Sequence, residues 1–211
     1  MATTTATGTR TIARLWQDAV ARHPDEPAYL VEENGDWHAL TWAEAGRLVD
    51  ELAHGLLALG VRKGDVFGIL ASTRVEWVLF DFALALVGGV TAPIYMNSST
   101  RDIAHVLEHS EAIGVLCEDD EQRRKIVGVD LEHVFTFAEL DELRARGREH
   151  ALSTPDAVQQ AAAEIADDDL YTYIYTSGTT GPPKACMIRH RNYYAMTNKV
   201  NGVERSRSPA T

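Results

Sequence analysis

Short apolar runs alternate with helical patterns through the middle of this 211-residue chain. Residues 66–70, 90–95 and 113–117 consist mostly of apolar and β-branched side chains, as do strands that are buried on both faces. The segment from 73 to 87, between the first two runs, repeats apolar residues at helical spacing. A strand, a crossover helix and a second strand make the unit of a parallel sheet. We therefore predict an α/β fold, with a mostly parallel sheet flanked by helices.

Hydroxyl residues followed three positions later by an acidic residue mark where helices begin. The chain has three such pairs ahead of helical patterns: Thr41 with Glu44, Thr73 with Glu76, and Ser99 with Asp102. The first two pairs predict capping boxes, in which each side chain accepts a hydrogen bond from the backbone N–H of the other residue. We expect helices to begin at all three places, the first of them running to about residue 59 and ended by Gly60.

The same periodicities assign the remaining segments. Further helices are expected at 11–22, 138–146, 190–200 and once within 147–169, and further strands at 28–32, 37–40, 134–137, 170–175 and 185–188. Residues 33–36 have the composition of a hairpin turn between the first two of these strands. The two ends lack periodicity. We therefore expect a disordered tail at 1–10, a domain at 11–200 and an irregular tail at 201–211.

The charge balance and the cysteines limit the classes of function. The chain has 31 Asp and Glu against 20 Lys and Arg. Because nucleic-acid binders present a basic face, we expect no nucleic-acid partner, although an acidic protein can still bind phosphate locally. Cys117 and Cys186 lack the spacing of metal ligands, which is typical of a reduced, cytoplasmic protein. The longest apolar stretch, 75–93, carries Glu76 and Asp81, so we expect no transmembrane segment; peripheral membrane contact stays open.

A loop rich in glycine, hydroxyl residues and proline follows the strand expected at 170–175. Such a loop offers polyphosphate close backbone N–H groups, hydroxyl donors and one cation. The candidate binding residues are Thr176, Ser177, Gly178, Thr179, Thr180, Gly181 and Lys184. A solvated turn would be the simpler interpretation, but the density of special residues disfavours it. A Walker A loop is excluded by spacing, because Lys184 follows Pro183 and Ala185 has no hydroxyl for magnesium.

The run from Tyr175 to Lys184 resembles the phosphate-binding signature of the adenylate-forming (AMP-binding) enzymes, which include acyl-CoA synthetases, luciferases and peptide-synthetase adenylation domains. The resemblance covers about residues 10 to 200. Its other segments are Gly64-Asp65, the helix with Trp77, residues 91–95, Asp168-Asp169-Leu170 and His190-Arg191-Asn192. Asn97-Ser98-Ser99 is most similar to the long-chain fatty acyl-CoA synthetases.

Two positions depart from the family pattern. Ala185 stands where the family has glycine, and alanine resists the positive φ that glycine adopts. Arg189 stands where the family has a small hydroxyl residue, so the cap of the following helix is expected to be weaker.

The resemblance implies fatty acid activation. A fatty acid, ATP and coenzyme A would give acyl-CoA, AMP and pyrophosphate through an acyl-adenylate, with Mg²⁺ as a cofactor. The loop from Thr176 to Gly181 would bind the β- and γ-phosphates, and Lys184 would stabilise charge on the leaving pyrophosphate. Two other functions stay open: adenylation of another carboxylate (medium-chain, aryl or amino acid), and a non-catalytic interaction fragment.

Members of the family are much longer than this chain. The resemblance therefore implies an incomplete N-terminal part of the large adenylate-forming domain, without the coenzyme A site or the C-terminal domain. We expect such a part to be inactive alone, and its patternless end suggests a shifted reading frame or an artificial terminus. A parallel sheet without its later strands would also leave an apolar edge prone to aggregation.

Other residues that attract attention have simpler interpretations. His105 and His109 have the i, i+4 spacing of metal ligands, but no third ligand has matching spacing, so we expect surface histidines and no metal site. The acidic clusters at 118–121 and 167–169 are expected to be solvated loop charge. The aromatic residues of the second capped helix are expected to lie in the core: Trp77, Phe80 and Phe82.

Overall fold

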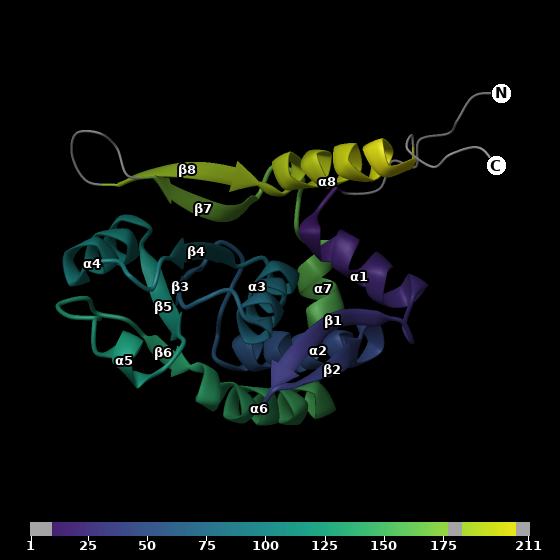
Figure 1. The fold of residues 1–211 in the computed structure, drawn as a ribbon, viewed down its shortest axis with the longest axis horizontal. Coiled ribbons are helices and arrows are strands. Elements are labelled where there is room, and N and C mark those ends of the chain that lie inside the picture. The colour runs from purple at the N-terminus through teal and green to yellow at the C-terminus, as the bar shows by residue number, and fades with distance from the viewer. Residues whose placement is uncertain (1–9, 177–182, 206–211) are drawn as a thin grey trace.

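The structure, a computed structural model, describes residues 10–176 and 183–205. Figure 1 shows the arrangement of its elements. The helices are α1 (Ile12–Arg22), α2 (Trp42–Ala58), α3 (Val75–Val87), α4 (Thr100–His109), α5 (Asp120–Arg123), α6 (Leu140–Ser153), α7 (Ala157–Ala163) and α8 (His190–Arg205), with a 3₁₀ turn at Phe137–Glu139. The strands are β1 (Pro27–Glu33), β2 (Asp36–Thr41), β3 (Val66–Leu70), β4 (Val90–Ile94), β5 (Ala112–Cys117), β6 (His133–Thr136), β7 (Leu170–Thr176) and β8 (Lys184–Arg189).

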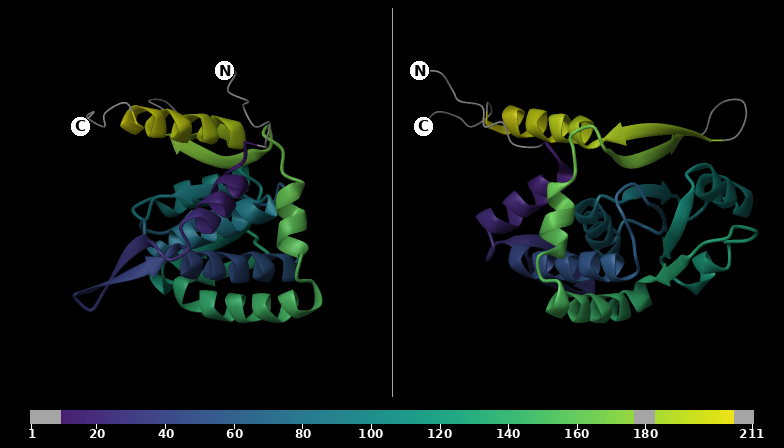
Figure 2. Two further views of the ribbon diagram at one scale, coloured as in Figure 1. Left: turned by 90° about the vertical axis from the view of Figure 1, so that its right-hand side faces the viewer. Right: turned by 180° about the vertical axis from the view of Figure 1, so that it is seen from behind.

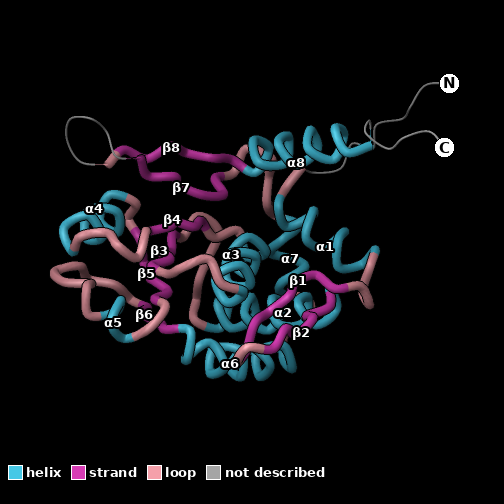
Figure 3. The backbone as a smooth tube through the Cα atoms, in the orientation of Figure 1, coloured by secondary structure: helices cyan, strands magenta, loops and turns pink. Residues whose placement is uncertain are grey.

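Six strands form one sheet in the order β6-β5-β3-β4-β7-β8. All neighbouring pairs are parallel except β7 and β8, which form an antiparallel hairpin. β1 and β2 make a separate antiparallel hairpin, and Figure 3 separates strands from helices by colour. The predicted α/β fold with a mostly parallel sheet is confirmed.

Helices cover both faces of this sheet, as Figure 2 shows from two further sides. The side chains of β3 alternate between the two faces. Phe67 and Ile69 join an apolar cluster with α1, α2 and α3, whereas Val66 and Leu70 join a second cluster with α4. A Cβ atom at Gly68 would lie 2.6 Å from Leu107 Cδ2, so the glycine permits the close approach of α4.

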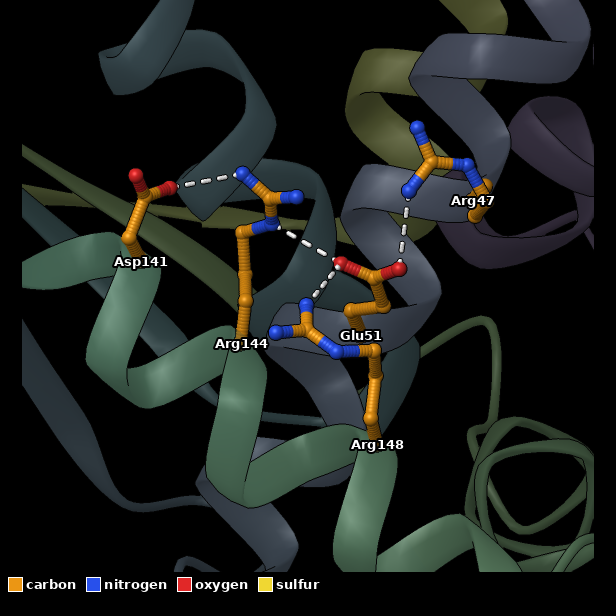
Figure 4. A network of polar contacts seen from close by, with 5 residues as sticks. All are labelled: Arg47, Glu51, Asp141, Arg144 and Arg148. Atoms are coloured by element: carbon orange, nitrogen blue, oxygen red, sulfur yellow. Dashed lines mark hydrogen bonds and ion pairs between the residues drawn. The ribbon is translucent and has the colours of Figure 1, made fainter.

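Helix α6 packs along α2 through a close backbone approach and an ion-pair network. A Cβ atom at Gly147 would lie 1.8 Å from the carbonyl oxygen of Glu51. The Glu51 carboxylate accepts hydrogen bonds from Arg47 (2.9 Å), Arg144 (2.8 Å) and Arg148 (3.0 Å), as Figure 4 shows. Burial acts to raise the pKa of Glu51, but the hydrogen bonds from Arg144 and Arg47 outweigh it and hold the pKa below its usual value.

The pairs at Thr41 and Ser99 both begin helices as expected, the first with a full capping box and the second with one of its two bonds. Thr41 and Glu44 cap α2 reciprocally, and Ser99 accepts from the backbone N–H of Asp102 at the start of α4. The prediction for Thr73 and Glu76 is wrong: α3 begins at Val75 behind Arg74, with no side-chain cap. Glu76 is therefore the second helical residue, too early to close the box, and its carboxylate instead accepts a hydrogen bond from Arg74 at 2.8 Å.

Several boundaries also differ from the predictions. The helix expected at 138–146 runs as α6 to Ser153, and the one expected at 190–200 runs as α8 to Arg205. The irregular tail expected at 201–211 is thus helical up to 205, because a helix once formed extends at little cost per residue. Arg10, expected in the N-terminal tail, is held by Asp167, which accepts from its backbone N–H at 2.6 Å. Residues 1–9 and 206–211 lie outside the described residues.

Within residues 10–176 and 183–205, no helix combines the length and apolar character needed to cross a membrane.

Candidate phosphate-binding site

The candidate loop joins the two strands of the β7–β8 hairpin. Thr176, the last residue of β7, lies opposite Lys184, the first residue of β8, and both side chains are exposed. The structure therefore brings two of the seven predicted binding residues together. The other five, Ser177, Gly178, Thr179, Thr180 and Gly181, lie outside the described residues. Because β7 runs parallel to β4, the loop emerges at the carboxyl edge of the parallel strands, where open α/β sheets bind ligands.

A buried polar network anchors β7 to the rest of the sheet. The Asp81 carboxylate on α3 accepts hydrogen bonds from the hydroxyls of Thr91 on β4 and Tyr171 on β7, each at 2.5 Å. The Thr172 hydroxyl donates to the carbonyl of Thr91 at 2.9 Å. Burial raises the pKa of Asp81, and the two hydroxyl donors oppose that rise. The same burial, with the nearby Asp81 charge, raises the pKa of Tyr171 well above its usual value.

Sequence reasoning missed this network, although it noted Asp81 within an apolar stretch. A carboxylate in the apolar middle of a helix signals a buried hydrogen-bonding role. Its partners could not be inferred, because Tyr171 is 90 residues away along the chain.

His190 begins α8 directly behind the hairpin and is fully buried. Its Nδ1 accepts from the backbone N–H of Ile12 at 3.1 Å, and its ring lies 5.3 Å from that of Tyr171. Burial lowers the pKa of His190 to about 4, against the opposing charges of Asp169 and Asp167. The imidazole is therefore neutral near pH 7, and it links the N-terminal helix to the end of the hairpin.

The two departures from the family pattern cause no visible strain. Ala185 lies within β8 opposite Tyr175, and the non-glycine residues with positive φ in the described part of the chain are Asn34 and Glu111. Arg189 has no hydroxyl, but its backbone N–H donates to Asn192 Oδ1 at 3.0 Å. That bond is one half of a capping box, so the start of α8 retains a side-chain cap.

The paired histidines of α4 lie against the hairpin. His105 Nε2 is 3.0 Å from the carbonyl oxygen of Pro183, and His109 Nδ1 is 2.9 Å from the hydroxyl of Tyr175. Both histidines therefore contact the hairpin; His109 is exposed as expected, whereas His105 is partly buried. No group of three or more His, Cys, Asp or Glu that could hold a metal ion occurs among the residues that the structure describes.

The acidic clusters are also more ordered than expected. Glu118 accepts from the backbone N–H and hydroxyl of Ser72, at 2.7 and 2.6 Å. In the second cluster, Asp167 pairs with Arg10 at 2.9 Å and Asp169 with Lys63 at 3.3 Å. These carboxylates fix loops rather than remaining only solvated.

The expected core aromatic residues are confirmed. Phe80 is completely buried, and Trp77 and Phe82 are partly buried against the same cluster.

Comparison with known proteins places the chain among its relatives. Residues 16–210 match the family model of the AMP-binding enzymes. The long-chain-fatty-acid–CoA ligase FadD15 of Mycobacterium bovis is 36% identical over 181 residues, which are 80% of this chain and 30% of that protein. The phosphinothricin tripeptide synthetase PhsC of Streptomyces viridochromogenes is 30% identical over 191 residues, covering 90% of this chain and 16% of that one. The chain thus spans about a third or less of the length of these relatives.

Among solved structures, a fatty acyl CoA synthetase of Mycobacterium tuberculosis superposes with a TM-score of 0.71. The match covers 86% of this chain and 35% of that one, at 24% identity, and so establishes similarity of fold alone. The family match over residues 16–210 goes further, and with it this chain belongs to the AMP-binding enzyme family.

Proposed function

We propose that this chain supplies the polyphosphate-binding wall of the ATP site in a long-chain fatty acyl-CoA ligase. The observation that carries the proposal is the position of Thr176 and Lys184, opposite each other and exposed at the carboxyl edge of the sheet. The substrate class rests on the fatty-acid ligase that is 36% identical to the chain. The reaction would convert a fatty acid, ATP and coenzyme A into acyl-CoA, AMP and pyrophosphate.

The chemistry assigned to the chain is stabilisation of the leaving group. Attack of a carboxylate at the α-phosphorus of ATP breaks the bond to pyrophosphate, and negative charge builds on the departing oxygens. Lys184 supplies a positive charge at the mouth of the hairpin, and Thr176 supplies a hydroxyl donor. The loop residues Ser177 to Gly181 would add hydroxyl and backbone N–H donors.

Within residues 10–176 and 183–205, no group of three or more His, Cys, Asp or Glu could hold a metal ion. We assign no residue of this chain to Mg²⁺, which enters only through the proposed reaction. Coenzyme A likewise enters only through the proposed reaction.

A cytoplasmic location agrees with the cysteines. Cys117 is a buried free thiol and Cys186 an exposed one, as in a reducing compartment.

A second function has its own support. The tripeptide synthetase that is 30% identical to the chain favours an amino acid, or another non-fatty carboxylate, as substrate. A non-catalytic interaction fragment is the third possibility, and it predicts that polyphosphate binding is dispensable.

A chimera tests the phosphate role directly. The segment of M. bovis FadD15 that matches this chain would be replaced by residues 16–200, and palmitate-dependent exchange of pyrophosphate into ATP would be measured. Exchange within about tenfold of the host enzyme would support the proposal, since one lost charge-assisted hydrogen bond alone costs roughly that factor. A folded, soluble chimera without exchange would leave the interaction fragment as the better account.

A further inference from the structure

The β7–β8 hairpin has little support from the sheet near the loop. Its parallel ladder with β4 consists of one residue pair, Thr91 opposite Thr172. Thr176 and Lys184 lie beyond that pair, at the far end of the hairpin. Figure 1 shows the hairpin running past β4 and over α4. We call the two chain segments that flank the loop, Tyr175–Thr176 and Pro183–Lys184, the loop stem. The position of the loop stem therefore depends on contacts other than the parallel ladder.

Helix α4, which is packed into the core, supplies those contacts. Three of its residues are buried in the second apolar cluster: Ile103, Val106 and Leu107. With these residues in the core, His105 and His109 lie one helical turn apart along the side that meets the hairpin.

Each histidine contacts a different strand of the stem. His105 Nε2 lies 3.0 Å from the carbonyl oxygen of Pro183, the residue before Lys184. His109 Nδ1 lies 2.9 Å from the hydroxyl of Tyr175, the residue before Thr176. Both imidazole rings also pack edge-on against the Tyr175 ring, with centroids 6.4 and 5.8 Å away. The two residues proposed to bind phosphate are thus each adjacent to a residue held by α4.

We propose that His105 and His109 are positioning residues for the phosphate loop, which hold Thr176 and Lys184 at the separation and orientation that polyphosphate requires. The role in phosphate binding rests on the proposed function. The two contacts of His105 and His109 with the loop stem, which we call the clamp, can be tested without any nucleotide. Neither histidine is assigned a contact with phosphate.

The experiment has two readouts on the 211-residue chain. Hydrogen–deuterium exchange of peptides within 170–190 measures how well the stem is protected in the absence of ligand. Calorimetric titration with inorganic tripolyphosphate measures the affinity for polyphosphate. His105→Ala and His109→Ala each remove one contact. His105→Gln and His109→Asn return a nitrogen or oxygen at about the same reach. Glu108→Ala, an exposed position on the same helix, is the matched control.

The clamp predicts that each alanine variant exchanges about two- to tenfold faster in the stem, the effect of one neutral hydrogen bond. Peptides of β3 and β4 should be unchanged. Tripolyphosphate affinity should fall by a similar factor, return to within twofold in the Gln and Asn variants, and stay unchanged in Glu108→Ala.

Two outcomes would overturn the inference. One is unchanged stem exchange in both alanine variants. The other is faster exchange with undiminished affinity, which would make the contacts structural only. If the wild-type chain bound no tripolyphosphate at all, the proposed function would fail and the positioning role with it, whereas the exchange data would still decide whether the clamp exists.

Discussion

At the scale of single residues, His190 shows how burial sets the charge state of a side chain that the family motif carries. Its ring is fully buried, and its Nδ1 accepts from the backbone N–H of Ile12. Protonation would convert that acceptor into a donor facing another donor, inside the core. Burial of the ring lowers its pKa to about 4, and the charges of Asp169 and Asp167 oppose this shift.

The stability of the protein should therefore depend on His190 in mildly acidic solution. An unfolded histidine titrates near 6.5, so between about pH 6.5 and 4 the unfolded chain binds more protons than the folded one. Its contribution is complete above that window and is lost as the pH falls through it. His190→Asn keeps an acceptor for Ile12 but does not titrate. From pH 7 to 5, the wild-type free energy of unfolding should fall by about 2 kcal/mol more than that of the variant.

Urea unfolding at both pH values measures this difference, with exposed His38→Asn as the control for loss of a histidine. Other titrating groups, including His54, whose pKa burial also lowers, act in both proteins and cancel. Equal losses of stability in the wild type and His190→Asn would show that the ring is not held neutral by its site.

Residue patterns alone predicted one of the two capping boxes correctly. Thr41 and Glu44 formed the capping box that their spacing indicates, whereas Thr73 and Glu76 did not, since α3 begins at Val75. The pattern is shared by both pairs. The spacing of the two residues alone therefore does not determine whether the box forms.

At the scale of elements, the pair α2 and α6 shows a glycine used for close packing. The sequence predicted that the helix ends at 146 and that a surface connection begins at Gly147. In the structure Gly147 lies in the middle of α6, against the backbone of Glu51. The arginines that bind Glu51 lie on both helices (Figure 4).

Gly147→Ala should therefore destabilise the protein, although alanine favours an isolated helix by about 1 kcal/mol over glycine. The new Cβ would lie 1.8 Å from a backbone oxygen that cannot turn aside, so the two helices must separate and weaken the Glu51 network. Overpacking of this kind costs about 1–3 kcal/mol. Thermal unfolding measures the loss, with exposed Glu149→Ala on the same helix as the control. A variant more stable than the wild type would show that α2 and α6 do not approach this closely.

At the scale of the whole molecule, the sequence predicts the layers better than the contacts between them. Alternating strand and helix patterns were enough to predict a mostly parallel sheet covered by helices on both faces, and the fold confirms this prediction. The order of the strands was not predicted, since β3 lies between β4 and β5 and no local pattern encodes that arrangement.

The contact between α4 and the loop stem could not be predicted from the sequence either, since His105 and Pro183 are separated by 78 residues along the chain. The hairpin also leaves apolar side chains exposed, such as Ile174 at 46% and Met187 at 56%.

The central claim is that Lys184 at the mouth of the hairpin binds polyphosphate, and titration calorimetry of the 211-residue chain with tripolyphosphate tests it most directly. Lys184→Ala removes one charge-assisted contact, so the affinity should fall by about ten- to a hundredfold. The control, Arg62→Ala, removes an equal charge just before β3, at the opposite edge of the sheet, and should change the affinity by less than about twofold. Equal affinities for the wild type and Lys184→Ala would contradict the account.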